Sequence, residues 1–254
     1  MRQTHRNFLV GLALSVAVSV VAACSSSSGP RASTSTSTTN GARPSIRAAD
    51  FRAVVDNPWF PLEPGTVTVF RGTKDGKSAR DVVTVTQRTV KIDGVPTRVV
   101  QDRLYLDGKL AESTLDYYTQ DTKGAVWYFG EDTATLDARG KVVDREGTWH
   151  SGVDGAQPGV FMEAHPTRGH TFRQEYYAGH AEDHFAVVDL STAIRVPAGA
   201  YRDAMLTKEW TPLEPDVLDH KYYVRGIGEV REVSVKGAVE SLSLVTRSGG
   251  ATPR

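Results

Sequence analysis

Three Asp-Gly dipeptides divide the middle of the chain, and each lies between runs rich in Val and Thr. They are Asp75-Gly76, Asp93-Gly94 and Asp107-Gly108. Asp-Gly readily adopts the positive φ angles of a type I′ turn, which joins two antiparallel strands through a two-residue loop. The sequence therefore predicts a series of consecutive β-hairpins in this region.

The hairpin around Asp107-Gly108 has a register that the apolar residues help to define. A two-residue loop sets Leu104 opposite Ala111 and Val100 opposite Leu115. Successive strand residues point to opposite faces, so this register gathers apolar side chains on one face. We therefore expect an apolar inner face on this pair of strands.

Short β-rich segments continue almost to the end of the chain, and few stretches show the period of a helix. A sheet of so many strands has to curve to protect its edges. The predicted fold class is all-β, a large curved antiparallel meander (half-barrel, barrel or sandwich) with a short N-terminal helix or turn. The segments concerned are 48–55 for the helix or turn, 151–166 for a long loop, and 66–73, 81–92, 125–131, 169–177, 182–191, 204–210, 220–224, 229–235 and 239–246 for strands.

The N-terminus has the pattern of an export signal. Arg2 and Arg6 precede an uncharged, largely apolar run over residues 8–23, which is shorter than the ~20 residues needed to span a bilayer. The following Val21-Ala22-Ala23-Cys24 resembles the lipobox of bacterial lipoproteins. An ordinary signal peptide or an uncleaved anchor would be the alternatives.

The lipobox resemblance implies cleavage before Cys24 and acylation of its thiol. Each buried CH₂ contributes ~0.8 kcal/mol, so two or three fatty chains anchor a protein stably where one does so marginally. We therefore expect a signal peptide over residues 1–23 and a lipid-anchored, extracytoplasmic protein on the cell membrane.

Composition then divides the rest of the chain. Residues 24–46 are the lipidated cysteine and a Ser/Thr-rich stretch with almost nothing apolar to bury, which is typical of a flexible tether. Residues 47–247 are long enough for a single β-rich domain, and 248–254 are expected to form a disordered tail.

Composition also excludes several functions. Cys24 is the only cysteine, so an acylated mature chain has no thiol for redox, zinc-thiolate or nucleophilic chemistry. Loss of Arg2 and Arg6 leaves 28 basic against 30 acidic residues, a net charge of −2, which gives no basic excess for nucleic acid. No G-x-S-x-G, P-loop or dinucleotide fingerprint occurs, so no catalytic residue is predicted and nothing positive indicates an enzyme.

One strand offers candidate ligand-binding residues. Residues 125–131 carry bulky side chains on both faces, with Trp127 and Phe129 pointing one way. A strand that is apolar on both faces is usually central or covered on both sides. The two aromatics are therefore expected either to pack in the core or to line a groove for an apolar ligand.

A second candidate site is the hairpin at 171–190. If a two-residue loop pairs Tyr177 with His180, alternation sets Glu175, His180, Glu182 and His184 on one face. His-x-Glu-x-His spaces its side chains by ~7 Å along a strand, a distance over which they can converge on a divalent metal. The alternative is a solvated polar face whose charges are screened by water.

Four longer stretches resemble a family of uncharacterised secreted or lipid-anchored bacterial proteins, many of them actinobacterial. The resemblance brings no established activity and no cofactor. The four stretches are 57–62 (NPWFPL), 126–131 (VWYFGE), 154–159 (DGAQPG) and 209–215 (EWTPLEP).

Two functions follow from these observations. The first is a non-enzymatic, lipid-anchored envelope module that binds an apolar small molecule or an envelope protein. The second is a divalent-metal-binding protein or metal-dependent hydrolase that uses the His/Glu cluster. The first is the preferred hypothesis.

Overall fold

A computed structural model of the chain describes residues 46–249. The predicted signal peptide, Cys24, nearly all of the predicted tether and residues 250–254 lie outside this range. Within it, no helix is long and apolar enough to cross a membrane.

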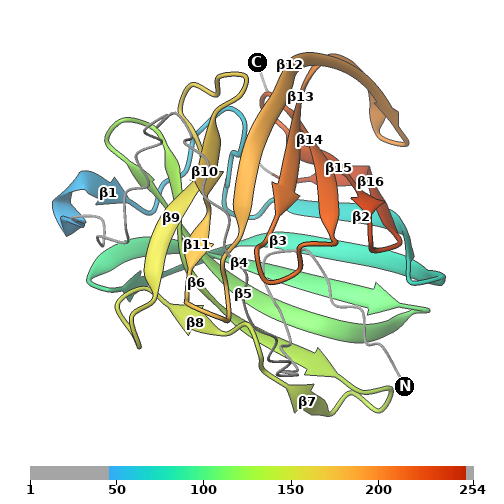
Figure 1. Cartoon of the computed structure of the whole chain (residues 1–254), viewed down its shortest axis with the longest axis horizontal. Coiled ribbons are helices and arrows are strands. Elements are labelled where there is room, and N and C mark those ends of the chain that lie inside the picture. The colour runs from blue at the N-terminus through green and yellow to red at the C-terminus, as the bar shows by residue number, and fades with distance from the viewer. Residues whose placement is uncertain (1–45, 250–254) are drawn as a thin grey trace, which may run out of the picture.

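The described residues form one antiparallel sheet, preceded by a short 3₁₀ helix (Figure 1). The predicted all-β class and its short N-terminal helix are thereby confirmed. The elements are η1 (Ala48–Asp50), β1 (Phe51–Arg52), β2 (Val67–Lys74), β3 (Lys77–Ile92), β4 (Val95–Leu106), β5 (Lys109–Asp121), β6 (Val126–Leu136), β7 (Val142–Asp144), β8 (Trp149–His150), β9 (Gln157–Met162), β10 (Thr171–Arg173), β11 (Glu175–Tyr176), β12 (His184–Val196), β13 (Gly199–Trp210), β14 (Leu218–Val224), β15 (Gly228–Lys236) and β16 (Glu240–Ser248).

The sheet curves until it nearly closes into a barrel. Its strand order is β10-β12-β13-β14-β15-β16-β2-β3-β4-β5-β6-β9-β11, so β10 and β11 are its two ends. These two strands are separated in the chain only by Gln174, whose backbone N–H donates to the carbonyl of Asp183 at 2.7 Å. The edges of the sheet therefore meet, which protects them from pairing with another chain.

The three Asp-Gly hairpins form as predicted. At all three dipeptides, φ is 49° to 52° for Asp and 74° to 78° for Gly. These are the angles of the type I′ turn, whose twist matches the right-handed twist of the flanking strands. The loops join β2 to β3, β3 to β4 and β4 to β5.

The predicted register of the β4–β5 hairpin is wrong beyond its first pairs. A register shift between Leu104 and Tyr105 sets Leu104 opposite Glu112 and Val100 opposite Asp116. Because side chains alternate along a strand, a shift of one residue exchanges the two faces of β5. Carboxyl groups, not Ala111 and Leu115, therefore face the interior here.

The predicted long loop over residues 151–166 contains a strand instead. β9 pairs with β6 on one side and with β11 on the other, and only one of its six residues is not buried. Gly159 allows this packing, because a Cβ there would lie 2.3 Å from the carbonyl oxygen of Arg173. A proline and a glycine within the strand hide it from pattern recognition.

Two apolar clusters fill the inside of the barrel, and Val83 packs against both. One includes Val85, Val100 and Tyr128, and the other includes Ala79 and Leu104. Asp81 lies between Val83 and Ala79 on β3, and Asp102 lies between Val100 and Leu104 on β4. A polar layer therefore separates the two apolar clusters.

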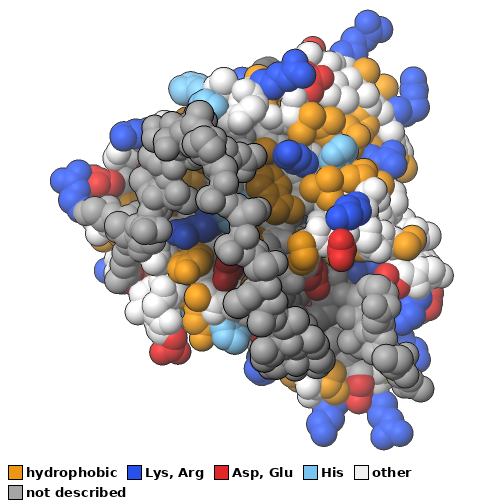
Figure 2. Space-filling model, viewed as in Figure 1, with side chains coloured by type: hydrophobic (Ala, Val, Ile, Leu, Met, Phe, Trp, Pro, Cys, Tyr) orange, Lys and Arg blue, Asp and Glu red, His pale blue; other side chains and the backbone are white. Residues whose placement is uncertain are grey.

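Hydrophobic side chains also reach the outer surface. On the face shown in Figure 2 they interrupt the charged surface near β13 and β14. The large apolar side chains that are exposed include Val54, Val143, Val235 and Val239. Scattered exposed apolar groups of this kind are normal on a folded domain.

Candidate functional site: a cavity inside the barrel

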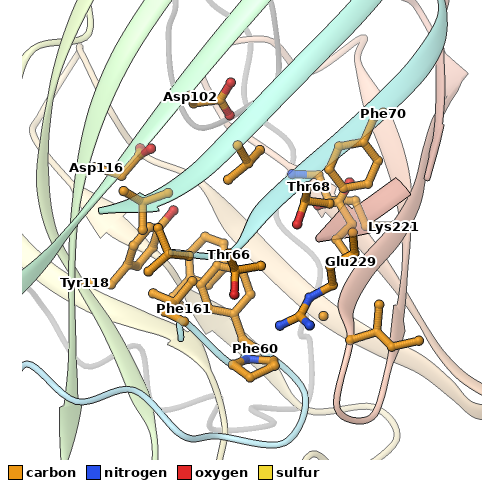
Figure 3. Close-up of a pocket in the computed structure, with 18 of the residues that line it drawn as sticks. Phe60, Thr66, Thr68, Phe70, Asp102, Asp116, Tyr118, Phe161, Lys221 and Glu229 are labelled. Atoms are coloured by element: carbon orange, nitrogen blue, oxygen red, sulfur yellow. The ribbon is translucent and has the colours of Figure 1, made fainter. Parts of the chain in front are cut away.

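A cavity lies between β2–β5 on one side and β14–β15 on the other (Figure 3). The volume that a water-sized sphere can reach is about 90 Å³, enough for several water molecules or a small organic group. Most of its wall is apolar, and the residues that form this part include Phe60, Leu62, Phe70, Val83, Val85, Val100, Phe161 and Ile227.

Three carboxyl groups and one ammonium group line the cavity as well. Asp102 projects from β4, Asp116 from β5, Lys221 from β14 and Glu229 from β15 (Figure 3). A few polar groups that converge in an otherwise apolar pocket are typical of a ligand site, since they fix the orientation of the ligand.

Lys221 is held by two carboxylates that do not line the cavity. Its Nζ lies 3.0 Å from Oε2 of Glu209 and 3.8 Å from Oε1 of Glu232. Burial by itself would lower the pKa of Lys221, but the two carboxylates outweigh it and raise that pKa well above its usual value. Lys221 is therefore protonated, and its charge is already paired with carboxylates of the protein.

Asp81 and Asp102 are diagonal neighbours on β3 and β4, since Asp81 pairs with Leu104 and Asp102 pairs with Val83. Asp81 is completely buried. Burial raises the pKa of Asp81 to about 7, although the hydrogen bond with Asp102 counteracts it. Burial also raises the pKa of Asp102 well above its usual value, and the Asp81 carboxyl raises it further. Two carboxyl groups can bond to each other only when one is protonated, and Asp81 has no other hydrogen-bond partner. Asp81 and Asp102 can therefore share one proton.

Asp116 has one fixed partner. The hydroxyl of Tyr128 donates to its Oδ1 at 2.7 Å. Burial, and then the charge of Asp102, raise the pKa of Asp116 well above its usual value, while the Tyr128 hydrogen bond lowers it. Asp116 is one of the residues that line the cavity (Figure 3).

Three threonines and an arginine also line the cavity, namely Thr66, Thr68, Thr114 and Arg247. The hydroxyl of Thr66, a residue only 2% exposed, has no hydrogen-bond partner. A register shift between Leu244 and Thr246 sets Arg247 opposite Thr68, which also lines the cavity. This bulge turns the Arg247 side chain toward the inside.

Trp127 and Phe129, the predicted ligand-binding residues, do not line the cavity. They pack against Phe51 of β1, with ring centroids 5.7 and 5.5 Å from its ring. The Trp127 indole N–H donates to Oδ2 of Asp121 at 3.0 Å. Of the two alternatives, the structure shows packing, because the Phe51 ring lies against both aromatic side chains.

The predicted metal ligands do not converge. Tyr177 pairs with Ala181 and not with His180, so the loop has three residues and the alternation changes after it. Glu175 is completely buried, and its Oε2 accepts a hydrogen bond from the Trp149 indole at 2.8 Å. The proposed common face of the hairpin therefore does not exist.

The other three members have separate local partners. His180 Nδ1 lies 3.1 Å from Oε1 of Glu146, Glu182 accepts a hydrogen bond from the Gly179 backbone at 2.8 Å, and the His184 ring stacks on Trp210. Nowhere in residues 46–249 do three or more His, Cys, Asp or Glu side chains form a group that could hold a metal ion.

The residues that converge in the cavity were missed in the sequence. Asp102 and Asp116 of the cavity wall, and Asp81 outside it, interrupt Val-rich or aromatic strands at positions of the same parity as core residues. Acidic residues at core positions of a strand are rare unless they are paired, and this pattern was the available signal.

Fold and cavity together define an all-β, barrel-like domain with an acid-lined cavity. No family model matches the chain, and no curated protein matches it. Two solved structures resemble this chain in the path of the backbone. One is a candidate exported protein with a YmcC-like fold from Bacteroides fragilis, with 16% identity and a TM-score of 0.44, covering 75% of this chain and 99% of its own.

The other is a candidate lipoprotein from Parabacteroides distasonis, with 12% identity and a TM-score of 0.41, covering 76% of this chain and 99% of its own. Neither source is an actinobacterium, so the actinobacterial part of the sequence resemblance has no support from them. At these scores neither neighbour indicates what this chain binds.

Proposed function

We propose that this chain is an exported lipoprotein, anchored to the cell membrane through Cys24, whose barrel-like domain binds a small molecule with an apolar body. The observation that carries the proposal is the cavity, in which an apolar wall surrounds a few inward-pointing polar groups. Its role is binding, and no catalytic residue is assigned.

The wall of the cavity supports an apolar ligand. The Phe60 and Phe161 rings, whose centroids are 4.6 Å apart, form part of it together with Tyr118. Aromatic side chains bury large areas with little rotamer freedom to lose, so they form rigid walls for a ligand. Apolar area removed from water contributes roughly 25 cal/mol per Å².

The lipobox supports the location. A lipid anchor and a Ser/Thr-rich tether would hold the domain near the outer surface of a membrane, where amphipathic molecules are abundant. The partners proposed are therefore the membrane, through the acylated Cys24, and an apolar small molecule in the cavity.

A pair of matched variants tests this function. Thr68→Trp would place an indole in the cavity, whereas Thr73→Trp places one on an exposed position of the same strand. Each full chain is purified from its own host, and small molecules are extracted and identified by mass spectrometry. We expect one stoichiometric apolar molecule with wild type and Thr73→Trp, and its loss with Thr68→Trp. Equal retention by both variants would contradict the proposal.

A further inference from the structure

We infer that the ligand carries a protonated amine, or an organic cation of similar size, which docks against Asp102 and Asp116 in the cavity. The inference rests on the proposed function and adds the chemical class of the ligand's polar group.

The balance of charge in the cavity favours a cation. Three carboxyl groups line it, on Asp102, Asp116 and Glu229. The Lys221 ammonium is already engaged by Glu209 and Glu232, which lie outside the cavity wall. An anionic head group would therefore meet carboxyl groups without a free cation beside them, whereas an ammonium group would meet acceptors.

Arg247 is the second cation of the wall, and it lies apart from Asp102. In the sheet, Thr68 pairs with Arg247 on one side and with Val83 on the other, and Val83 in turn pairs with Asp102. Two strands thus separate Arg247 from Asp102, and its guanidinium is not a direct partner for the carboxyl group.

A buried hydroxyl without a partner provides a second, independent indication. The Thr66 hydroxyl is buried, lines the cavity and has no hydrogen-bond partner within the described residues. Buried polar groups are normally satisfied, so groups left open at a cavity indicate a ligand that supplies donors. An ammonium group supplies three.

Protonation of the carboxyl pair couples to this binding. Before the ligand arrives, the proton shared by Asp81 and Asp102 reduces the negative charge of the interior. An ammonium group stabilises the ionised carboxylate, so its binding displaces this proton to solvent. Binding of an amine near pH 7 should therefore release protons, whereas binding of a neutral molecule should not.

Three probes with the same hydrocarbon chain separate these cases: n-hexylamine, 1-hexanol and hexanoate. Isothermal titration of the full chain in nanodiscs at pH 7, with empty nanodiscs as the blank, measures each affinity. We expect n-hexylamine to bind about tenfold more tightly than 1-hexanol, and hexanoate to bind most weakly. Repeating the titration in buffers of different ionisation enthalpy should show proton release with the amine alone.

Isosteric variants locate the amine. Asp102→Asn and Asp116→Asn keep the shape of the protonated side chains, so they preserve the fold. They also remove the negative charge that the carboxylate would carry when the amine is bound. Each should weaken n-hexylamine about tenfold and leave 1-hexanol within about twofold. Glu131→Gln is the matched control, because Glu131 is completely buried and faces Asp116 across β5 and β6 but does not line the cavity.

The outcomes distinguish the inference from the proposed function. Equal or tighter binding of 1-hexanol or hexanoate would overturn the amine while leaving the cavity as a ligand site. Equal loss of amine affinity in Glu131→Gln would also overturn the assignment to Asp102 and Asp116. Failure of all three probes to bind would overturn both the inference and the proposed function.

Discussion

The Lys221 ammonium nitrogen lies 3.0 Å from Oε2 of Glu209, with both side chains no more than 6% exposed. Glu232, on the adjacent strand, lies 3.8 Å from the same nitrogen. Desolvation of buried charges is costly, and only close pairing compensates for it. The contact between Lys221 and Glu209 therefore compensates for the burial of charged side chains inside the barrel.

Replacing Lys221 by methionine should destabilise the protein by about 3–5 kcal/mol, because Glu209 and Glu232 would be left buried without their cation. Urea unfolding followed by circular dichroism measures the change. Lys236→Met is the control, since its ion pair with Asp216 is exposed and should contribute about 0–1 kcal/mol. Similar effects of the two substitutions would contradict this role of Lys221.

Stability should fall as the pH rises from about 4 to about 7. The pKa of Asp81 is about 7 in the folded chain, raised by burial from an ordinary value of 3.8. Between these values the folded state holds a proton that the unfolded state has lost, so raising the pH favours unfolding. Burial also raises the pKa of Glu131 and of Glu175, and these two groups contribute to the same dependence of stability on pH.

Urea unfolding at pH 5 and at pH 8 tests this dependence. Wild type should be more stable at pH 5, and Asp81→Asn should reduce the difference, because an amide cannot lose the proton in question. A wild-type protein that is more stable at pH 8 would show that these carboxyl groups are ionised in the folded chain.

The hairpins could be predicted from the sequence because each Asp-Gly turn is a local feature that fixes its own backbone angles. The position of the carboxyl groups could not. The position of Asp116 depends on the register shift at Leu104, which exchanges the faces of β5. The predicted metal ligands are separated by the pairing of Tyr177 with Ala181, which changes the alternation after the loop. A single inserted residue decides each case, and neither leaves a compositional signal.

Gly130 has a similar effect on β6. Its φ is 138°, and a Cβ there would lie 2.3 Å from the carbonyl oxygen of Trp149. It precedes Glu131, which faces Asp116 after a register shift in the β5–β6 pairing. The glycine therefore allows β6 to turn a carboxyl group inward, next to the outward-facing Phe129.

Gly130→Ala should accordingly destabilise the protein by more than about 2 kcal/mol, since both the backbone conformation and the close contact exclude a Cβ. Thermal and urea unfolding measure the loss. Gly140→Ala is the matched control: its φ is also positive, at 78°, but the space around it is open, so about 1 kcal/mol is expected. Equal losses would show that the contact with Trp149 is unimportant.

Cys24→Ser should release the protein from the membrane, because serine lacks the thiol that lipoprotein acylation requires. Fractionation of cells that express wild type or the variant, with detection by immunoblot, measures the shift. Wild type should remain with the membranes after a high-salt wash, which removes proteins held by charge alone. Retention of the variant would indicate an uncleaved apolar segment as the anchor.

Native mass spectrometry of wild type purified from the membranes of its own host tests the central claim most directly. The predicted mass is that of a chain beginning at an acylated Cys24 with one small molecule bound non-covalently, and dissociation should release this molecule as a cation. A chain without fatty acyl groups, or an acylated chain that carries no such molecule, would contradict the account of a tethered, ligand-binding barrel.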